Sequence, residues 1–133
     1  SVLIEGFQQT VLAPFDLSAG DYGVLAALRR AGAPYQLSPS SLYSRLQRSS
    51  GGMTKILKRV EERGLVVRAP DPADGRGSVV SLTDEGLTVQ DRVFRAFLEG
   101  SQDLLSPLTE TEVKDTDRVL TDLLDLFEVR FSR

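Results

Sequence analysis

Apolar residues recur along this chain with two periods, and the two periods predict different elements. Spacings of three and four residues, typical of amphipathic helices, occur over 1–13, 19–31, 49–63, from 84 up to 107, and from 109 onward. A shorter helix is expected from Pro39 to about residue 46. Two short segments that each contain a pair of valines, 65–68 and 78–82, predict a hairpin, and 35–37 is extended enough to add a short strand. The pattern therefore predicts a mainly α fold with a small β-hairpin.

Polar residues at two of the predicted helix starts support these boundaries. Ser18 is followed three residues later by Asp21, the spacing of a capping box in which each residue satisfies the other's backbone N–H. Thr109 and Glu112 repeat this spacing before the last helix. Gly32 follows the second helix, where a glycine commonly ends a helix.

The helix over 49–63 is apolar on one side and basic on the other. Its apolar residues share one narrow face that must be buried, and geometry then fixes the opposite face. Such a helix fits the major groove of DNA, which has phosphates along both rims. The other interpretation is an ordinary solvated charged face. The buried residues are Met53, Ile56, Leu57 and Val60. The outward residues are Gly51, Lys55 and Lys58, with Thr54 and Arg59 on the flanks and Glu62 toward the C-terminal end.

The two helices on either side of residues 47–49 are joined closely enough to form a helix-turn-helix. Ser49 and Ser50 are expected to cap the second helix. Gly51 and Gly52 are poor helix formers at such a place, and they suit a backbone that comes close to a phosphate. A second interpretation is that the two glycines only provide a flexible turn.

The predicted hairpin has a stiffened loop with an arginine near its tip. Two prolines, at 70 and 72, stiffen the loop, and Gly75 and Gly77 permit the turn, so Arg76 is expected to project from the domain. A projecting arginine suits a narrow minor groove, where the potential is most negative. Asp74 is better interpreted as a brace of the loop than as a phosphate contact. Alternatively, Asp74 and Arg76 form an ordinary exposed ion pair of little energetic value.

The net charge of −3 is unevenly distributed along the sequence. Between Arg45 and Arg76 there are eight basic and four acidic residues, so this segment is positive although the whole chain is acidic. An acidic remainder repels DNA from other faces and leaves one docking surface.

Several classes of function are disfavoured by composition. The chain has no Cys and no His, which removes thiol chemistry, the commonest general base and the commonest metal ligands. We see no convincing carboxylate pair, so we expect no enzyme activity, no cofactor and no metal. No apolar run approaches the roughly 18 residues of a membrane span, and we expect a cytoplasmic protein without a membrane partner.

The last predicted helix is apolar over more of its circumference than one core contact needs. Its apolar residues span an arc of about 160°, against roughly 100° for a single packing face. The excess predicts a partner, most simply a second copy related by two-fold symmetry. The alternative is a helix sandwiched inside its own domain. These residues are Val119, Leu120, Leu123, Leu124, Leu126 and Phe127.

Four motifs in order resemble the MarR family of bacterial transcriptional regulators. They are the runs SSGGMTK at 49–55, VEERGLV at 60–66, PDPADGR at 70–76 and SLTDEG at 81–86. The resemblance covers roughly residues 17–86 by motif and the flanking helices by architecture alone. It implies a winged helix-turn-helix whose helix 49–63 reads the major groove, with Arg76 in the minor groove and Asp74 supporting the wing. Gly75 departs from the family, which more often has a second arginine there.

The resemblance also implies an organisation and two kinds of partner. The chain is expected to be one domain over 1–133, with the winged helix-turn-helix at 17–82 and dimerisation helices at 1–13 and 84–133. Double-stranded DNA with a palindromic site is the expected partner of the homodimer, and a small aromatic or phenolic effector is common in the family. Nothing in the sequence marks an effector site. The alternative function is a winged-helix module that binds protein without binding DNA.

Overall fold

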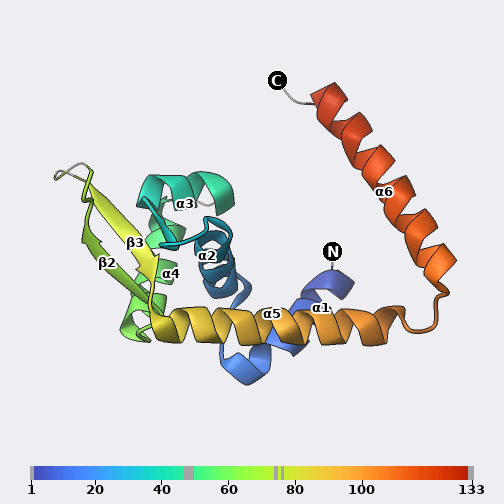
Figure 1. Cartoon of the computed structure of the whole chain (residues 1–133), viewed down its shortest axis with the longest axis horizontal. Helices are drawn as coiled ribbons and strands as arrows, with labels where there is room; N and C mark the ends of the chain where they lie inside the picture. Colours follow the sequence, from blue (N-terminus) through green and yellow to red (C-terminus); the bar gives the residue numbers. More distant parts are fainter. Residues whose placement is uncertain (1, 47–49, 74, 76, 132–133) are drawn as a thin grey trace. The chain divides into compact units, whose positions relative to one another are not determined.

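The computed structural model describes residues 2–46, 50–73, 75 and 77–131, and it confirms the mainly α fold with a small sheet (Figure 1). The chain divides into two compact units, 1–97 and 98–133, which are described separately. The single-domain organisation stays a prediction. In chain order the elements are α1 (Val2–Leu12), the 3₁₀ helix η1 (Ala13–Phe15), α2 (Ala19–Arg30), β1 (Gln36–Leu37), α3 (Pro39–Leu46), α4 (Ser50–Glu62), β2 (Val66–Pro70), β3 (Ser78–Leu82), α5 (Asp84–Leu105) and α6 (Glu110–Phe131).

Helix α2 begins and ends where its local chemistry predicts. Ser18 and Asp21 form the complete capping box: the Asp21 carboxylate accepts from the Ser18 N–H at 2.8 Å, and Ser18 Oγ accepts from the Asp21 N–H at 3.2 Å. Past the other end, Gly32 has φ +78°, a left-handed conformation that costs glycine little. The predicted boundaries of this helix are therefore confirmed to within a residue.

The three strands form one antiparallel sheet in the order β1-β3-β2. The predicted hairpin is confirmed, with Val67 opposite Ser81 and Arg68 opposite Val80. Strand β2 extends further than predicted and ends at Pro70, which faces Ser78. A proline is tolerated there because β2 is an edge strand, so no neighbour on its outer side needs the missing N–H.

The core of the first unit forms where α2, α3, α4 and the sheet meet; Figure 1 shows these helices beside the β2–β3 hairpin. The predicted apolar face of α4 is confirmed, because its four residues are at most 7% exposed. They pack in one cluster with apolar residues of α2 and with Leu42 of α3. Burying this face fixes which side of α4 reaches solvent. The α4 residues are Met53, Ile56, Leu57 and Val60, and the α2 residues include Val24, Leu25 and Leu28.

Helix α5 starts in direct contact with the turn between α4 and β2. Thr83 Oγ1 accepts from the Gly86 N–H at 2.9 Å and donates to the Gly64 carbonyl at 2.6 Å, while the Thr83 N–H donates to the Leu65 carbonyl at 3.1 Å. A Cβ on Gly86 would lie 1.9 Å from the Leu65 oxygen. Only a glycine fits this approach without moving backbone.

The second unit holds the end of α5 and all of α6. The predicted capping box opens α6: the Glu112 carboxylate accepts from the Thr109 N–H at 2.8 Å, and this hydrogen bond holds the pKa of Glu112 below its ordinary value. None of the described side chains in this unit is buried. The six apolar residues of the wide α6 arc are 47–66% exposed. The described part of α6 therefore leaves about half of the surface of these apolar side chains exposed to solvent.

No single helix among the described residues is long and apolar enough to cross a membrane. The segments Val2–Phe15 and Ala19–Arg30 reach that length and composition only when counted together across an 80° bend.

We predict that Gly86→Ala destabilises the protein, because the added methyl group meets the Leu65 carbonyl. Overpacking of this kind costs about 1–3 kcal/mol in the free energy of unfolding, which urea denaturation measures. Gly6→Ala in α1 is the matched control, since a Cβ there meets no atom within 4 Å. Alanine should stabilise that helix by about 0.5–1 kcal/mol. Equal effects at the two positions would contradict the close approach of α5.

Candidate nucleic-acid interface

The outward face of α4 is basic and lies in solvent. Gly51, Thr54, Lys55 and Lys58 are exposed, opposite the buried stripe. The side chain of Lys58 is 76% exposed, and its nearest carboxylate, Glu62 one turn on, is 3.8 Å away. An exposed pair at this distance contributes little, so the lysine charge stays available to a polyanion. The predicted orientation of α4 is confirmed, and its contact with DNA stays a prediction.

Arg59, predicted as a DNA contact, has an intramolecular partner in this structure. Its Nε lies 2.8 and 3.0 Å from the two oxygens of Asp21, its Nη2 is 2.5 Å from Asp21 Oδ1, and Nη2 donates to Ser18 Oγ at 2.8 Å. The Asp21 side chain is 2% exposed, whereas that of Arg59 is 49% exposed. A guanidinium that satisfies a buried carboxylate is held there, because removing it leaves a buried charge without its partner. Sequence reasoning found Asp21 only as a capping residue.

A second arginine supports α4 one turn further on. Arg63 donates to the backbone carbonyls of Asp16 and of Phe15, the latter at 2.9 Å. Arg59 and Arg63 are spaced i, i+4 and therefore share one edge of the helix. Together they tie that edge to residues 15–21 and fix the rotation of α4 about its axis. Sequence reasoning missed Arg63, although its spacing from Arg59 was a usable signal.

The start of α4 differs from the predicted turn. Ser49 lies outside the described residues, and Ser50 is the first residue of α4. Gly51 and Gly52 lie inside the helix, so a flexible turn at these glycines is not what the structure shows. Helix α3 packs against α2 and β3, and its Leu42 is buried in the same core as the apolar face of α4. Its own start is capped by Ser38, whose Oγ accepts from the Ser41 N–H at 3.2 Å.

The tip of the wing lies partly outside the described residues. Asp74 and Arg76, the predicted brace and minor-groove arginine, belong to that part, and their roles stay predictions. At the base of the loop, the Asp71 N–H donates to the Gly77 carbonyl at 3.0 Å, and the Asp71 carboxylate accepts from the Ala73 N–H at 2.9 Å. The first of these bonds closes the loop next to the last strand pair, Pro70 with Ser78, and the second holds the local turn that follows Asp71.

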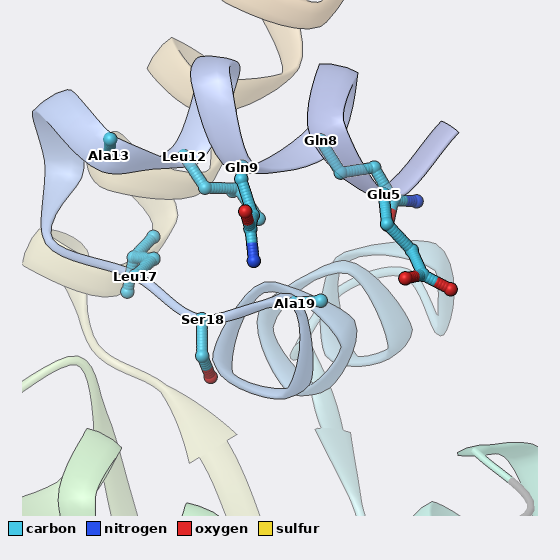
Figure 2. A pocket seen from close by; sticks show the side chains of 8 residues that line it. All are labelled: Glu5, Gln8, Gln9, Leu12, Ala13, Leu17, Ser18 and Ala19. Carbon is cyan, nitrogen blue, oxygen red and sulfur yellow. The ribbon is translucent and has the colours of Figure 1, made fainter. Parts of the chain in front are cut away.

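A pocket of about 460 Å³ lies between α1 and the start of α2. Figure 2 shows Gln9 extending from α1 toward the first residues of α2. Leu12 and Leu17 are buried beside it, and Ser18, which also contacts Arg59, lines one side. The full lining is Glu5, Gln8, Gln9, Leu12, Ala13, Leu17, Ser18 and Ala19. Pockets of this size accept small organic molecules.

Aromatic and charged contacts join α2 to the part of α5 that belongs to the first unit. Arg29 Nε donates to Asp91 Oδ1 at 3.0 Å, and this hydrogen bond raises the pKa of Arg29 above its ordinary value. The ring of Tyr22 lies 5.1 Å from that of Phe97, and burial raises the pKa of the Tyr22 hydroxyl. These groups keep α5 on the winged unit. Among the described residues, no group of three acidic, His or Cys side chains is placed to hold a metal ion.

Comparison with known proteins agrees with this geometry. A sequence profile of the MarR family matches residues 15–77, the segment from η1 to the wing loop. The HTH-type transcriptional regulator PecS of Dickeya dadantii (strain 3937) is 38% identical over 112 residues, which cover 84% of this chain and 68% of PecS. The multiple antibiotic resistance protein MarR of Escherichia coli (strain K12) is 31% identical over 114 residues, covering 85% of this chain and 77% of that protein.

Solved structures give the same result for the fold. Wild-type E. coli MarR in its apo form superposes with a TM-score of 0.79 at 29% identity, covering 90% of this chain and 87% of that one. A mutant E. coli MarR complexed with operator DNA superposes with a TM-score of 0.73, also at 29% identity, covering 90% and 84% of the two chains. By sequence and by fold, the chain belongs to the MarR family.

Proposed function

We propose that this transcriptional regulator acts as a homodimer that binds a palindromic DNA operator in the cytoplasm. The observation that carries the proposal is the outward basic face of α4, held in place by the Arg59–Asp21 ion pair and by Arg63. A helix so fixed presents its N-terminal half to the major groove. The similar E. coli MarR mutant solved with operator DNA supports the same use of this fold.

Each predicted site residue has a distinct role in this proposal. Lys55 and Lys58 meet phosphates and base edges in the major groove, with Thr54 beside them. Ser49, Ser50 and Gly52 are proposed to meet the DNA backbone near the start of the helix, and Gly51 is proposed to face the groove between them. Arg76 enters the minor groove, and Asp74 supports the wing. Arg59 acts from within the protein by orienting α4.

The dimer follows from the apolar surface that the described chain leaves exposed. Large apolar side chains of α6 are about half exposed, and burying a Leu or Phe completely contributes about 1.5–3 kcal/mol. Val2, Leu3 and Ile4 of α1 are also exposed, between 66% and 88%. A second copy brings identical surfaces together about a two-fold axis. The same symmetry matches two α4 helices to the two halves of a palindrome.

We further propose that a small aromatic or phenolic effector releases the regulator from DNA. The pocket between α1 and α2 supports this proposal by its size and by its apolar side at Leu12 and Leu17. Ser18 lines the pocket and also accepts a hydrogen bond from Arg59 of α4. A ligand in the pocket that contacts Ser18 is therefore separated from Arg59 by this one side chain.

The salt dependence of DNA binding should distinguish a phosphate contact by Lys55 from a structural role of Arg59. Each phosphate contact contributes about 0.9 to the slope of log K against log salt. Lys55→Gln is expected to lower the slope by about one and leave the melting temperature unchanged. Arg59→Gln is expected to lower the melting temperature with little change in slope, because the lost interaction is with Asp21. Fluorescence anisotropy over a salt series, with thermal melts, measures both quantities.

Two outcomes of that series would contradict the proposal. If Arg59→Gln lowers the slope as Lys55→Gln does and leaves stability intact, Arg59 contacts phosphate. If wild-type affinity for duplex DNA is insensitive to salt, the chain is better described as a protein-binding module.

Arg76→Ala should weaken binding to all DNA sequences similarly and lower the slope of log K against log salt by about one.

We predict that Leu123→Glu on α6 dissociates the dimer, because a carboxylate cannot be buried without a partner. Sedimentation velocity at micromolar concentration should show a monomer, with operator affinity lost in parallel. Thr121→Glu, which adds the same charge about 160° around the helix from Leu123, is the matched control and should remain dimeric. A dimeric Leu123→Glu protein would place the interface elsewhere.

A larger side chain in the pocket between α1 and α2 should prevent an effector from binding there. In a panel of simple phenols and aromatic acids, active compounds are expected to lower operator affinity and raise the melting temperature of the protein. Ala19→Phe narrows the pocket and should abolish both responses, while ligand-free operator affinity stays within about twofold, since Ala19 lies off the α4 face. A response that persists in Ala19→Phe assigns the effector to another site.

A further inference from the structure

Gly51 occupies a position where this fold has no need of glycine. An ideal Cβ built at Gly51 meets no atom within 4 Å. The residue lies inside α4, and among the described residues the glycines with positive φ are Gly32 and Gly64. Neither packing nor backbone conformation therefore explains the missing side chain. Glycine also weakens a helix relative to alanine, so its presence here works against stability.

Gly20 and Gly86, two other helical glycines of the first unit, contrast with Gly51. A Cβ at Gly20 would lie 2.7 Å from Ile56 Cδ1, and one at Gly86 would lie 1.9 Å from the Leu65 carbonyl oxygen. Both glycines permit close packing between elements of the same chain. At Gly51 the chain itself supplies no such neighbour, so a close approach there would be to a partner outside the chain.

The direction of Gly51 around the axis of α4 shows which part of a DNA groove this residue would face. At 100° per residue, Gly51 lies within about 10° of the direction opposite the centre of the buried stripe. Lys55 and Lys58 lie about 30° to either side of that direction. When α4 enters a major groove, the central direction points to the base edges and the flanks point to the phosphates on the two rims. Gly51 therefore faces the floor of the groove.

We infer that Gly51 is a clearance position, at which the absent side chain lets the first turn of α4 reach the base edges. This inference rests on the proposed DNA binding and adds a determinant of operator specificity to it. Any side chain at residue 51 holds the helix away from the groove floor. Contacts with the bases are then lost, while the lysines still reach the phosphates on the rims.

The test compares Gly51→Ala and Gly51→Leu with the wild-type protein on two DNA probes. One probe is an operator selected by the wild-type protein from a pool of random duplexes, and the other is an unselected duplex of equal length. For Gly51→Ala we expect operator affinity to fall about tenfold, the loss of one base contact. Gly51→Leu should lose more. Affinity for the unselected duplex should change less than about twofold, because phosphate contacts supply that binding.

Melting temperatures of the variants show whether a loss of DNA affinity comes from a loss of folding. Gly51→Ala should melt no lower than wild type, because a Cβ at this position meets no atom of the protein within 4 Å. A lower melting temperature for Gly51→Ala, unchanged operator affinity, or equal losses on both probes would overturn the clearance role. Failure of the wild-type protein to bind either duplex would instead overturn the proposed function.

Discussion

One buried carboxylate fixes the geometry on which the candidate interface depends. Asp21 closes the capping box at the start of α2 and pairs with Arg59 of α4. Its side chain is almost fully buried, so its charge requires these partners. A single group thus sets where one helix begins and how another is rotated. The basic face of α4 points outward because its apolar face is buried and because its edge is held at Asp21.

The two units differ in how far they satisfy their own hydrophobic surface. The first unit buries a continuous core that includes α2, α3, α4 and the sheet. In the second unit, no described side chain is buried, although α6 carries a wide apolar arc. The same segment, 98–133, has nine acidic and four basic residues. Exposed apolar side chains favour contact with another protein chain, and a net negative charge disfavours contact with DNA.

Local signals in the sequence were sufficient for most of the fold. The capping box at Ser18, the end of α2 at Gly32 and the apolar spacing of α4 each report a short-range interaction, and each was confirmed. The partners of Arg59 and Arg63 lie 38 to 48 residues earlier in the chain. Periodicity carries no information about such pairs. Arg59 was therefore predicted as a DNA contact, whereas the structure gives it a partner inside the protein.

The edge position of β2 has a consequence for the protein when it is not bound to DNA. An exposed edge strand offers unpaired backbone groups to other chains and invites sheet extension between molecules. Here the strand has only five residues, and Pro70 at its end has no N–H to donate. Val67, half exposed on the same strand, would otherwise favour such self-association. A short edge that ends in proline lets a ribbon project into solvent with little tendency to aggregate.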